Sequence, residues 1–188
     1  LVQSFCTGGK EKVHASDCEV LTRVQRDLER RGGDRIAIEA AGLTGTAAMK
    51  AYEKAATTYM DLWKKYGEAA CREKTAGCEK NEEILYNAAR AYQAARLMAK
   101  AIGVRKLLID PQYNLQRTEP ARKAMYEIGA NYQAIASYDD AATYYERFAA
   151  ENPTMAKAPE ALQDAIVLRL GLGQEKQAID DAELFGKS

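Results

Sequence analysis

Residues 122–153 carry two apolar stripes of helical period on either side of a short polar break. The first stripe consists of large side chains at steps of three and four residues: Met125, Ile128, Tyr132 and Ile135. The second begins after Ser137 and consists of Tyr138, Ala141, Ala142, Tyr145 and Phe148. Side chains at these steps share one face of a helix, and an apolar face has to be covered. The segment therefore predicts two helices that fold back on each other antiparallel, and Pro153 ends the second.

Two small residues set how closely these helices approach each other. Gly129 belongs to the first helix and Ala141 to the second. Short side chains at a helix crossing let the two backbones interlock. We therefore expect a packed hairpin, in which replacement of Gly129 by leucine costs a few kcal/mol through overpacking.

A single hairpin leaves its outer face uncovered, so neighbouring copies are expected. Forty residues upstream, the first-helix spacing recurs at Leu85, Ala88, Ala89 and Tyr92. Thirty-seven residues downstream it recurs at Leu162, Ala165 and Ile166, with Arg169 where a tyrosine would stand. The three copies lie near residues 82–111, 122–153 and 159–188.

The second helices of the outer copies are less regular than that of the central copy. The upstream copy has Arg105 or Gly103 where an aromatic residue is expected. The last copy has the small residues Ala178 and Ala182 in its second helix. We expect irregular packing in both places.

A further strong helical pattern precedes the three copies. Its apolar face consists of Met49, Tyr52, Ala56, Tyr59, Trp63 and Tyr66. The partner helix would be residues 18–31, whose stripe of Leu21, Val24 and Leu28 ends at the Arg-Arg-Gly-Gly run of residues 30–33. Residues 34–45 fit either a loop or the first turns of the long helix. We therefore divide the chain into an N-terminal arm with a degenerate first helix (1–45) and a helical repeat domain (46–188).

The central copy resembles the tetratricopeptide repeat (TPR) family. The slots of the TPR signature are filled by Met125, Ile128, Gly129, Tyr132, Ala141, Tyr145 and Pro153. Only the opening tryptophan of the signature is replaced, by methionine. The resemblance implies an all-α fold, a right-handed α-solenoid of antiparallel hairpins with about three to four repeats.

The resemblance also implies that the first helices line a concave groove that holds another protein or a peptide. The first-helix residues outside the packing stripes would contact the partner: Tyr86, Arg90, Gln93, Lys123, Tyr126, Glu127 and Gln133. Tyrosine and arginine are common interface anchors. The alternative is that Tyr86 and Tyr126 pack between repeats. One TPR subtype grips a C-terminal carboxylate with Lys and Asn, but Tyr126 and Ala130 occupy those positions here, so we do not expect that ligand.

Residues 46–188 are also similar to bacterial cell-envelope TPR proteins, which scaffold periplasmic complexes of the outer-membrane assembly or motility type. The strings that carry this likeness are AYEKAATTYMDLWKKYG, LYNAARAY and ALQDAIVLRLGLGQEKQAIDDAELF. The likeness implies a periplasmic scaffold that binds protein. The oligomeric state is left open by the sequence.

Four cysteines bear on the compartment. Cys71 and Cys78 bracket a polar turn, and Cys6 and Cys18 bracket a glycine-containing segment, so we favour these two local disulfides among the three possible pairings. Two disulfides indicate a protein outside the reducing cytoplasm. The alternatives are four free thiols in a cytosolic protein and, less favoured by spacing, a metal site made of Cys6, His14 and Cys18.

Composition and motifs argue against other classes of function. The chain has 27 basic and 27 acidic residues, whereas general binders of nucleic acid or anionic membranes need a positive excess. No apolar stretch approaches the ~20 residues that span a bilayer. No catalytic or cofactor-binding motif is present, and Gly171-Leu172-Gly173 falls at an expected turn, so we expect no enzyme activity, cofactor or metal.

Two alternative functions remain open. One is a cytosolic helical-repeat RNA-binding protein, because related hairpin repeats recognise bases with first-helix side chains. The other is an accessory domain of a larger enzyme, because we expect the chain to be a fragment of a longer protein.

Overall fold

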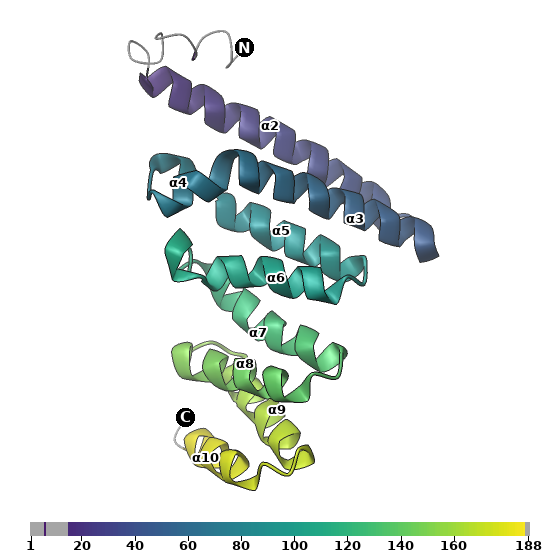
Figure 1. The fold of residues 1–188 in the computed structure, drawn as a ribbon, viewed down its shortest axis with the longest axis vertical. Helices are drawn as coiled ribbons and strands as arrows, with labels where there is room; N and C mark the ends of the chain where they lie inside the picture. The colour runs from purple at the N-terminus through teal and green to yellow at the C-terminus, as the bar shows by residue number, and fades with distance from the viewer. Residues whose placement is uncertain (1–5, 7–14, 187–188) are drawn as a thin grey trace. The chain divides into compact units, whose positions relative to one another are not determined.

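The computed structural model describes Cys6 and residues 15–186, and this part of the chain consists of helices joined by short turns, without a β-strand (Figure 1). The chain divides into two compact units, residues 1–96 and residues 97–188. The all-α fold expected from the helical periodicity is confirmed. The boundary expected after residue 45 falls at the turn between the first two helices of the first unit, and the division made there stays a prediction.

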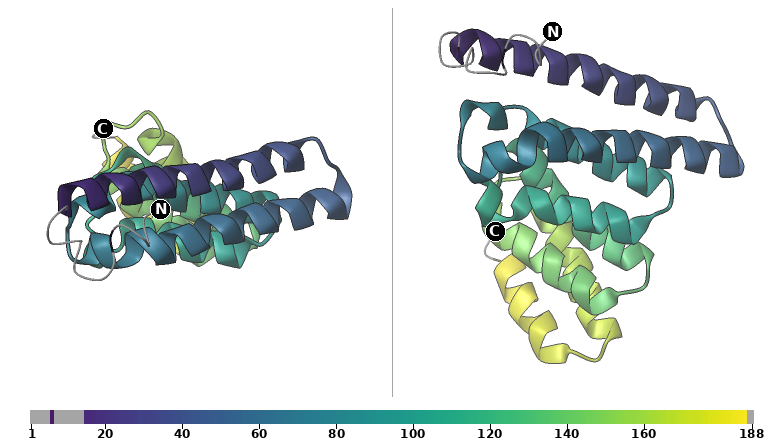
Figure 2. Two further views of the ribbon diagram at one scale, coloured as in Figure 1. Left: turned by 90° about the horizontal axis from the view of Figure 1, so that it is seen from above. Right: turned by 45° about the horizontal axis from the view of Figure 1, so that its top comes forward.

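The first unit is built on two long helices, α2 (Ala15–Ala41) and α3 (Gly45–Leu62). They lie side by side along their length (Figure 2). α3 continues through a π-helical turn, Trp63–Gly67, into the short α4, Glu68–Arg72. A 3-10 turn, Ala76–Cys78, then leads to α5, Asn81–Ala94, which packs against α3. α3 is thus covered by a helix on each of two faces.

The prediction that the first helix ends at residues 30–33 is wrong, because α2 runs on to Ala41. Gly33 is buried, and a Cβ atom placed on it would lie 2.8 Å from Cε1 of Tyr59. The glycine therefore gives the tyrosine ring of α3 room against the α2 backbone. The Tyr59 hydroxyl also donates a hydrogen bond of 2.7 Å to Asp34 Oδ1, one residue further along α2. Residues 34–41 are thus helical, and Asp34 belongs to this contact.

The π-helical turn ties the end of α3 to the start of α5. A π-turn inserts a residue into the helix and rotates the side chains that follow. Gly67 lies in this turn, and a Cβ atom placed on it would clash with Trp63 and with the side-chain amide of Asn81. The Asn81 amide donates to the carbonyl oxygens of Gly77 (2.8 Å) and Cys78 (3.0 Å). The loop that holds the second cysteine pair is therefore fastened to the helix that follows it.

The second unit consists of consecutive helices that each pack on the next. They are α6 (Met98–Ile109), α7 (Glu119–Ala134), α8 (Tyr138–Glu151), α9 (Ala158–Gly171) and α10 (Glu175–Phe185). A 3-10 turn, Pro111–Tyr113, follows α6. Thr118 caps α7 by accepting a hydrogen bond from the amide of Ala121 at 3.3 Å.

The α7–α8 hairpin matches the prediction from the two stripes. Met125, Ile128, Ala141, Ala142, Tyr145 and Phe148 are all buried. A Cβ atom on Gly129 would lie 2.8 Å from the Tyr145 ring, so the two helices cross at this glycine. Ile135 and Tyr138 are exposed, although both belong to the predicted stripes. They flank the turn between the two helices.

The same turn follows the first helix of each of the three copies. Arg96, Ala136 and Gly173 have φ values of 61°, 60° and 72°, in the left-handed region. They follow the last turns of α5, α7 and α9, respectively. The backbone amide of each donates a hydrogen bond to the carbonyl oxygen three residues earlier. The turns recur at the spacing of the sequence motifs, so the repetition predicted from side chains is present in the backbone.

Buried arginines stand at two of the places where the repeats depart from the signature. Arg105 replaces the expected aromatic and donates from Nε and Nη2 to Glu127 Oε2, at 2.8 and 2.7 Å, and from Nη1 to Asn131, at 2.6 Å. Arg169 replaces a tyrosine and donates to both carboxylate oxygens of Glu146, at 2.5 and 2.9 Å. Buried charges require such partners, so ion pairs hold together helices that aromatic packing holds elsewhere.

Candidate functional site

The first unit contains a groove of about 400 Å³ between α2, α3 and α5. Much of its lining is small or apolar: Ala37, Ile38 and Ala41 on α2, and Ala91 and Ala94 on α5. Tyr52 and Tyr59 contribute from α3. Alanine at four of these positions leaves room beside the helix backbones. The groove can therefore take an apolar side chain from outside the molecule.

Two polar side chains of α5 face this groove without a partner. Asn87 and Arg90 are three residues apart, which places them on one face of the helix. Neither makes a hydrogen bond or an ion pair with any residue that the structure describes. Arg90 is exposed and Asn87 is partly buried. The groove thus offers five guanidinium N–H groups and one amide to a ligand.

The carboxylate in the groove is already used by the fold. Asp34 accepts from the Tyr59 hydroxyl, at 2.7 Å, and forms an ion pair of 3.4 Å with Arg30. Burial, and next the bond to Asp34, raise the pKa of Tyr59 well above its usual value, so its hydroxyl stays protonated and donating. Asp34 therefore does not compete strongly for Arg90.

Arg90 is the one predicted partner-binding residue that lines this groove. Tyr86 is half-buried on the same helix, and Gln93, one turn after Arg90, is exposed. A contact of these two residues with a partner stays a prediction.

The four predicted residues of α7 make contacts within the second unit. The ring of Tyr126 packs on Tyr145 and Phe148, with centroids 5.4 and 5.5 Å apart. Its hydroxyl donates to Glu160 Oε1 at 2.9 Å. Tyr126 thus joins α7 to α8 and α9, and its aromatic face is largely occupied.

Glu127, Gln133 and Lys123 are also engaged. Glu127 accepts from Arg105, as described above. Gln133 accepts from the Tyr145 hydroxyl at 2.8 Å. Lys123 pairs with Glu119 at 2.7 Å, one turn earlier on the exposed surface. Of the four, Lys123 can exchange its partner most easily, because exposed ion pairs are weak.

The α2 side of the groove was not predicted from the sequence. Its residues lie in the segment 34–45, which the sequence pattern left between loop and helix. Asn87 belongs to the repeat string LYNAARAY but lies outside its apolar stripe. The signal that could have found this side was the pair Gly33 and Tyr59, which repeats the small-residue and aromatic pairing of Gly129 and Tyr145.

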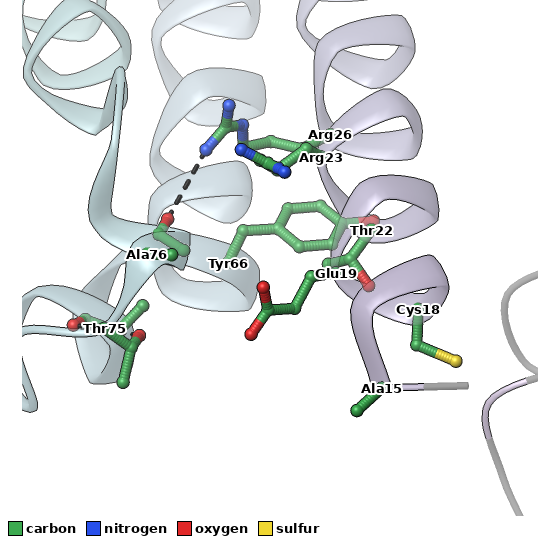
Figure 3. A pocket seen from close by; sticks show the side chains of 11 residues that line it. Ala15, Cys18, Glu19, Thr22, Arg23, Arg26, Tyr66, Thr75 and Ala76 are labelled. Carbon is green, nitrogen blue, oxygen red and sulfur yellow. Dashed lines mark hydrogen bonds between the residues drawn. The ribbon is translucent and has the colours of Figure 1, made fainter. Parts of the chain in front are cut away.

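A second cavity, of about 460 Å³, lies between the start of α2 and the loop before α5 (Figure 3). Three of its polar side chains are paired within the chain. Arg26 donates to the carbonyl oxygens of Glu79, at 2.6 Å, and Gly77, at 3.4 Å. Tyr66 donates to Glu29 at 2.9 Å, and Arg23 pairs with Glu79 at 3.5 Å. These contacts fasten α2 to the loop. Glu19 and Thr22 also line this cavity and make no hydrogen bond or ion pair with a residue that the structure describes.

The structure joins the two local cysteine pairs. The Cα atoms of Cys6 and Cys18 are 5.7 Å apart, and those of Cys71 and Cys78 are 4.5 Å apart, both within the range for disulfides. His14, named in the alternative metal site, lies outside the described residues. Among the residues that are described, no three metal-binding side chains cluster.

Comparison with known proteins adds little to this geometry. No family model matches the chain, and no curated protein matches it. Among solved structures, the chain is similar to TPR-like repeats of a kinesin light chain from Podosopora anserina. The identity is 15%, the match covers 90% of this chain and 95% of that one, and the TM-score is 0.47. No helix within residues 15–186 combines the length and apolar character needed to cross a membrane.

Proposed function

We propose that the protein is a non-enzymatic scaffold that binds a peptide segment of another protein in the groove between α2, α3 and α5. The observation that carries this proposal is the pair of unpartnered polar side chains, Asn87 and Arg90, beside an alanine-walled slot. Polar groups that orient a ligand next to an apolar recess are the usual composition of a binding site.

The chemistry of the groove defines the segment that it fits. A guanidinium group binds a carboxylate through two parallel hydrogen bonds, so Arg90 favours an Asp or Glu side chain. The Asn87 amide can donate to and accept from a peptide backbone. The slot beside Ala41, Ala91 and Ala94 favours an aliphatic side chain next to the acidic one. The expected ligand is therefore a short segment with adjacent acidic and aliphatic residues.

The alternative of RNA binding is disfavoured by charge. The chain has no net charge, and the groove holds Asp34 as well as Arg90. Binding to a phosphate backbone gains its affinity from several basic side chains that release counterions. A labelled oligouridine at micromolar protein concentration should show no salt-dependent change in fluorescence polarisation, and such a change would favour the RNA alternative.

The two disulfides support a compartment outside the cytoplasm. Two structural disulfides are stable in oxidising surroundings such as the bacterial periplasm, and are rare in the cytoplasm. We therefore place the scaffold outside the cytoplasm. An envelope complex of bacteria, of the outer-membrane assembly or motility type, is the setting that the sequence resemblance favours.

A peptide selection tests the binding site directly. A library of random ten-residue peptides is selected on the whole chain, and enriched peptides are titrated by fluorescence polarisation. We expect enrichment of an acidic residue beside an aliphatic one. Arg90→Glu should weaken the selected peptides by about tenfold or more, the size of one charge-assisted contact.

Two further variants separate the groove from general effects. Ala94→Trp fills the slot and should abolish binding with the helical circular dichroism signal unchanged. Lys64→Glu makes the same charge change as Arg90→Glu at an exposed position outside the groove, and should leave the affinity unchanged. Enriched peptides that bind Arg90→Glu and Ala94→Trp as well as the parent chain would exclude the groove as the site.

A further inference from the structure

The outward face of α2 carries an exposed aliphatic stripe. Val20, Val24 and Leu28 follow steps of four residues, and their side chains are 49%, 50% and 58% exposed. The opposite face of the same helix, with Arg26, Gly33 and Ala40, is buried. Isolated exposed aliphatic residues are common, but three in line on one helix form a surface that can pack against another helix.

An acidic residue precedes this stripe along the helix, and a basic residue follows it. Asp17 lies one turn before Val20, and Arg31 lies one turn after Leu28; both are exposed. Asp17 already has an interaction within its own chain, and at an exposed position such a contact is weak and can be exchanged. The order along the helix is therefore acidic, three aliphatic residues, basic. Val24 is at its centre, with Asp17 and Arg31 each seven residues away.

This order is complementary to itself when a second copy runs antiparallel. With Val24 opposite Val24 of the second copy, Val20 faces Leu28 and Asp17 faces Arg31, twice over. A parallel arrangement would instead place Asp17 against Asp17 and Arg31 against Arg31, which is repulsive. A two-fold interface requires a surface that matches itself in this way.

We propose that this face of α2, defined by Asp17, Val20, Val24, Leu28 and Arg31, is the contact surface for a second copy of the chain, packed antiparallel about Val24. Three aliphatic side chains and two exposed ion pairs make a contact smaller than the interfaces of stable dimers, so the association is weak and reversible. The groove between α2, α3 and α5 is formed by other residues and stays available to a peptide in the dimer.

Sedimentation equilibrium of the whole chain, with its disulfides intact, tests the proposal. We expect self-association at about 10 to 500 micromolar protein, a range suited to weak interfaces. Asp17→Lys and Arg31→Glu should each weaken it by about tenfold, because each places like charges opposite each other. The double variant Asp17→Lys/Arg31→Glu should restore association to within about threefold of the parent chain.

The double charge swap identifies the orientation, because a parallel pair would stay repulsive after it. Val24→Arg should abolish association by placing two arginines at the centre of the interface. Asp61→Lys, at an exposed position on α3, is the control of equal charge change and should have no effect. A monomer at every concentration overturns the proposal, and so does a double variant that fails to recover. The affinity for the selected peptides should be the same in Asp17→Lys, so the failure of either proposal leaves the other to be judged separately.

Discussion

The ring of Tyr145 lies against the backbone of Gly129, so close that a Cβ atom on the glycine would be 2.8 Å from two ring carbons. Tyr59 and Gly33 repeat this relationship in the first unit, with the same closest distance. In both hairpins the ring of a tyrosine on the second helix packs against the glycine of the first helix, in the space next to its missing side chain. The crossing of the helices therefore depends on the absence of one methyl group.

Replacement of Gly129 by alanine should destabilise the protein. Tyr145 is buried, packs on Tyr126 and is hydrogen-bonded to Gln133, so its ring cannot move aside. Overpacking of this kind costs about 1–3 kcal/mol, more than the gain of up to ~1 kcal/mol in helix propensity. Urea unfolding monitored by circular dichroism measures the change in free energy.

Gly103 is the matched control for this substitution. It lies within α6 and is exposed, and a Cβ atom added to it would have no neighbouring atom within 4 Å. Gly103→Ala should therefore stabilise the protein by about 0.5–1 kcal/mol. Equal effects of the two substitutions would contradict the tight crossing at Gly129.

A glycine in the turn between α7 and α8 should stabilise the protein. Ala136 has a φ of 60°, where a residue with a Cβ is strained, while Gly173 occupies the equivalent position after α9 without strain. Ala136→Gly should stabilise the protein by about 0.5–1 kcal/mol, and Gly173→Ala should destabilise it by a similar amount. Unfolding midpoints of the two variants should thus move in opposite directions, and a shift in the same direction would argue against equivalent turns.

Removal of the Cys71–Cys78 disulfide should loosen the contact between the loop and α2. The double variant Cys71→Ala/Cys78→Ala should lose about 2–3 kcal/mol, the chain-entropy value for a short loop. The same loop presents the Gly77 and Glu79 carbonyl oxygens to Arg26, so protection of α2 amides from hydrogen exchange should fall as well. Denatured, unreduced parent protein should show no free thiol, and four thiols would refute the argument for an oxidising compartment.

Asp181 makes the second unit sensitive to pH. Burial, followed by the nearby Glu146 carboxylate, raises the pKa of Asp181 from 3.8 to about 7, against the opposing effect of Arg169. Its Oδ2 atom is buried and has no hydrogen-bond partner among the described residues. The folded state therefore holds a proton that the unfolded chain releases between about pH 4 and 7, so the stability due to this group falls as the pH rises through that range.

Asp181→Asn should remove this dependence. The variant should be more stable than the parent chain at pH 8, by on the order of 1–2 kcal/mol, and the difference should shrink at pH 5. Asp180→Asn, at the exposed neighbouring position, is the control and should change little. Parallel stability curves for the parent chain and Asp181→Asn between pH 5 and 8 would contradict the raised pKa.

Local periodicity in the sequence was enough to predict the helices and the best hairpin. The stripes of α7 and α8, the small residue at Gly129 and the turn spacing all depend on residues within a few positions of one another. The two cysteine pairs are local in the same sense. The sequence alone thus determined the all-α class and the repetition of helix hairpins.

The tertiary structure decided which of these side chains are engaged by other parts of the fold. Gly33 was expected to end a helix, but Tyr59, 26 residues away in the chain, makes it a contact point. Tyr126 and Glu127 were expected to face a partner, but Glu160 and Arg105 engage them. Asn87 and Arg90 of α5 line the same groove as residues of α2 because both helices pack against α3. Helical period shows which residues share a face, but the element that covers that face is chosen by packing between distant segments.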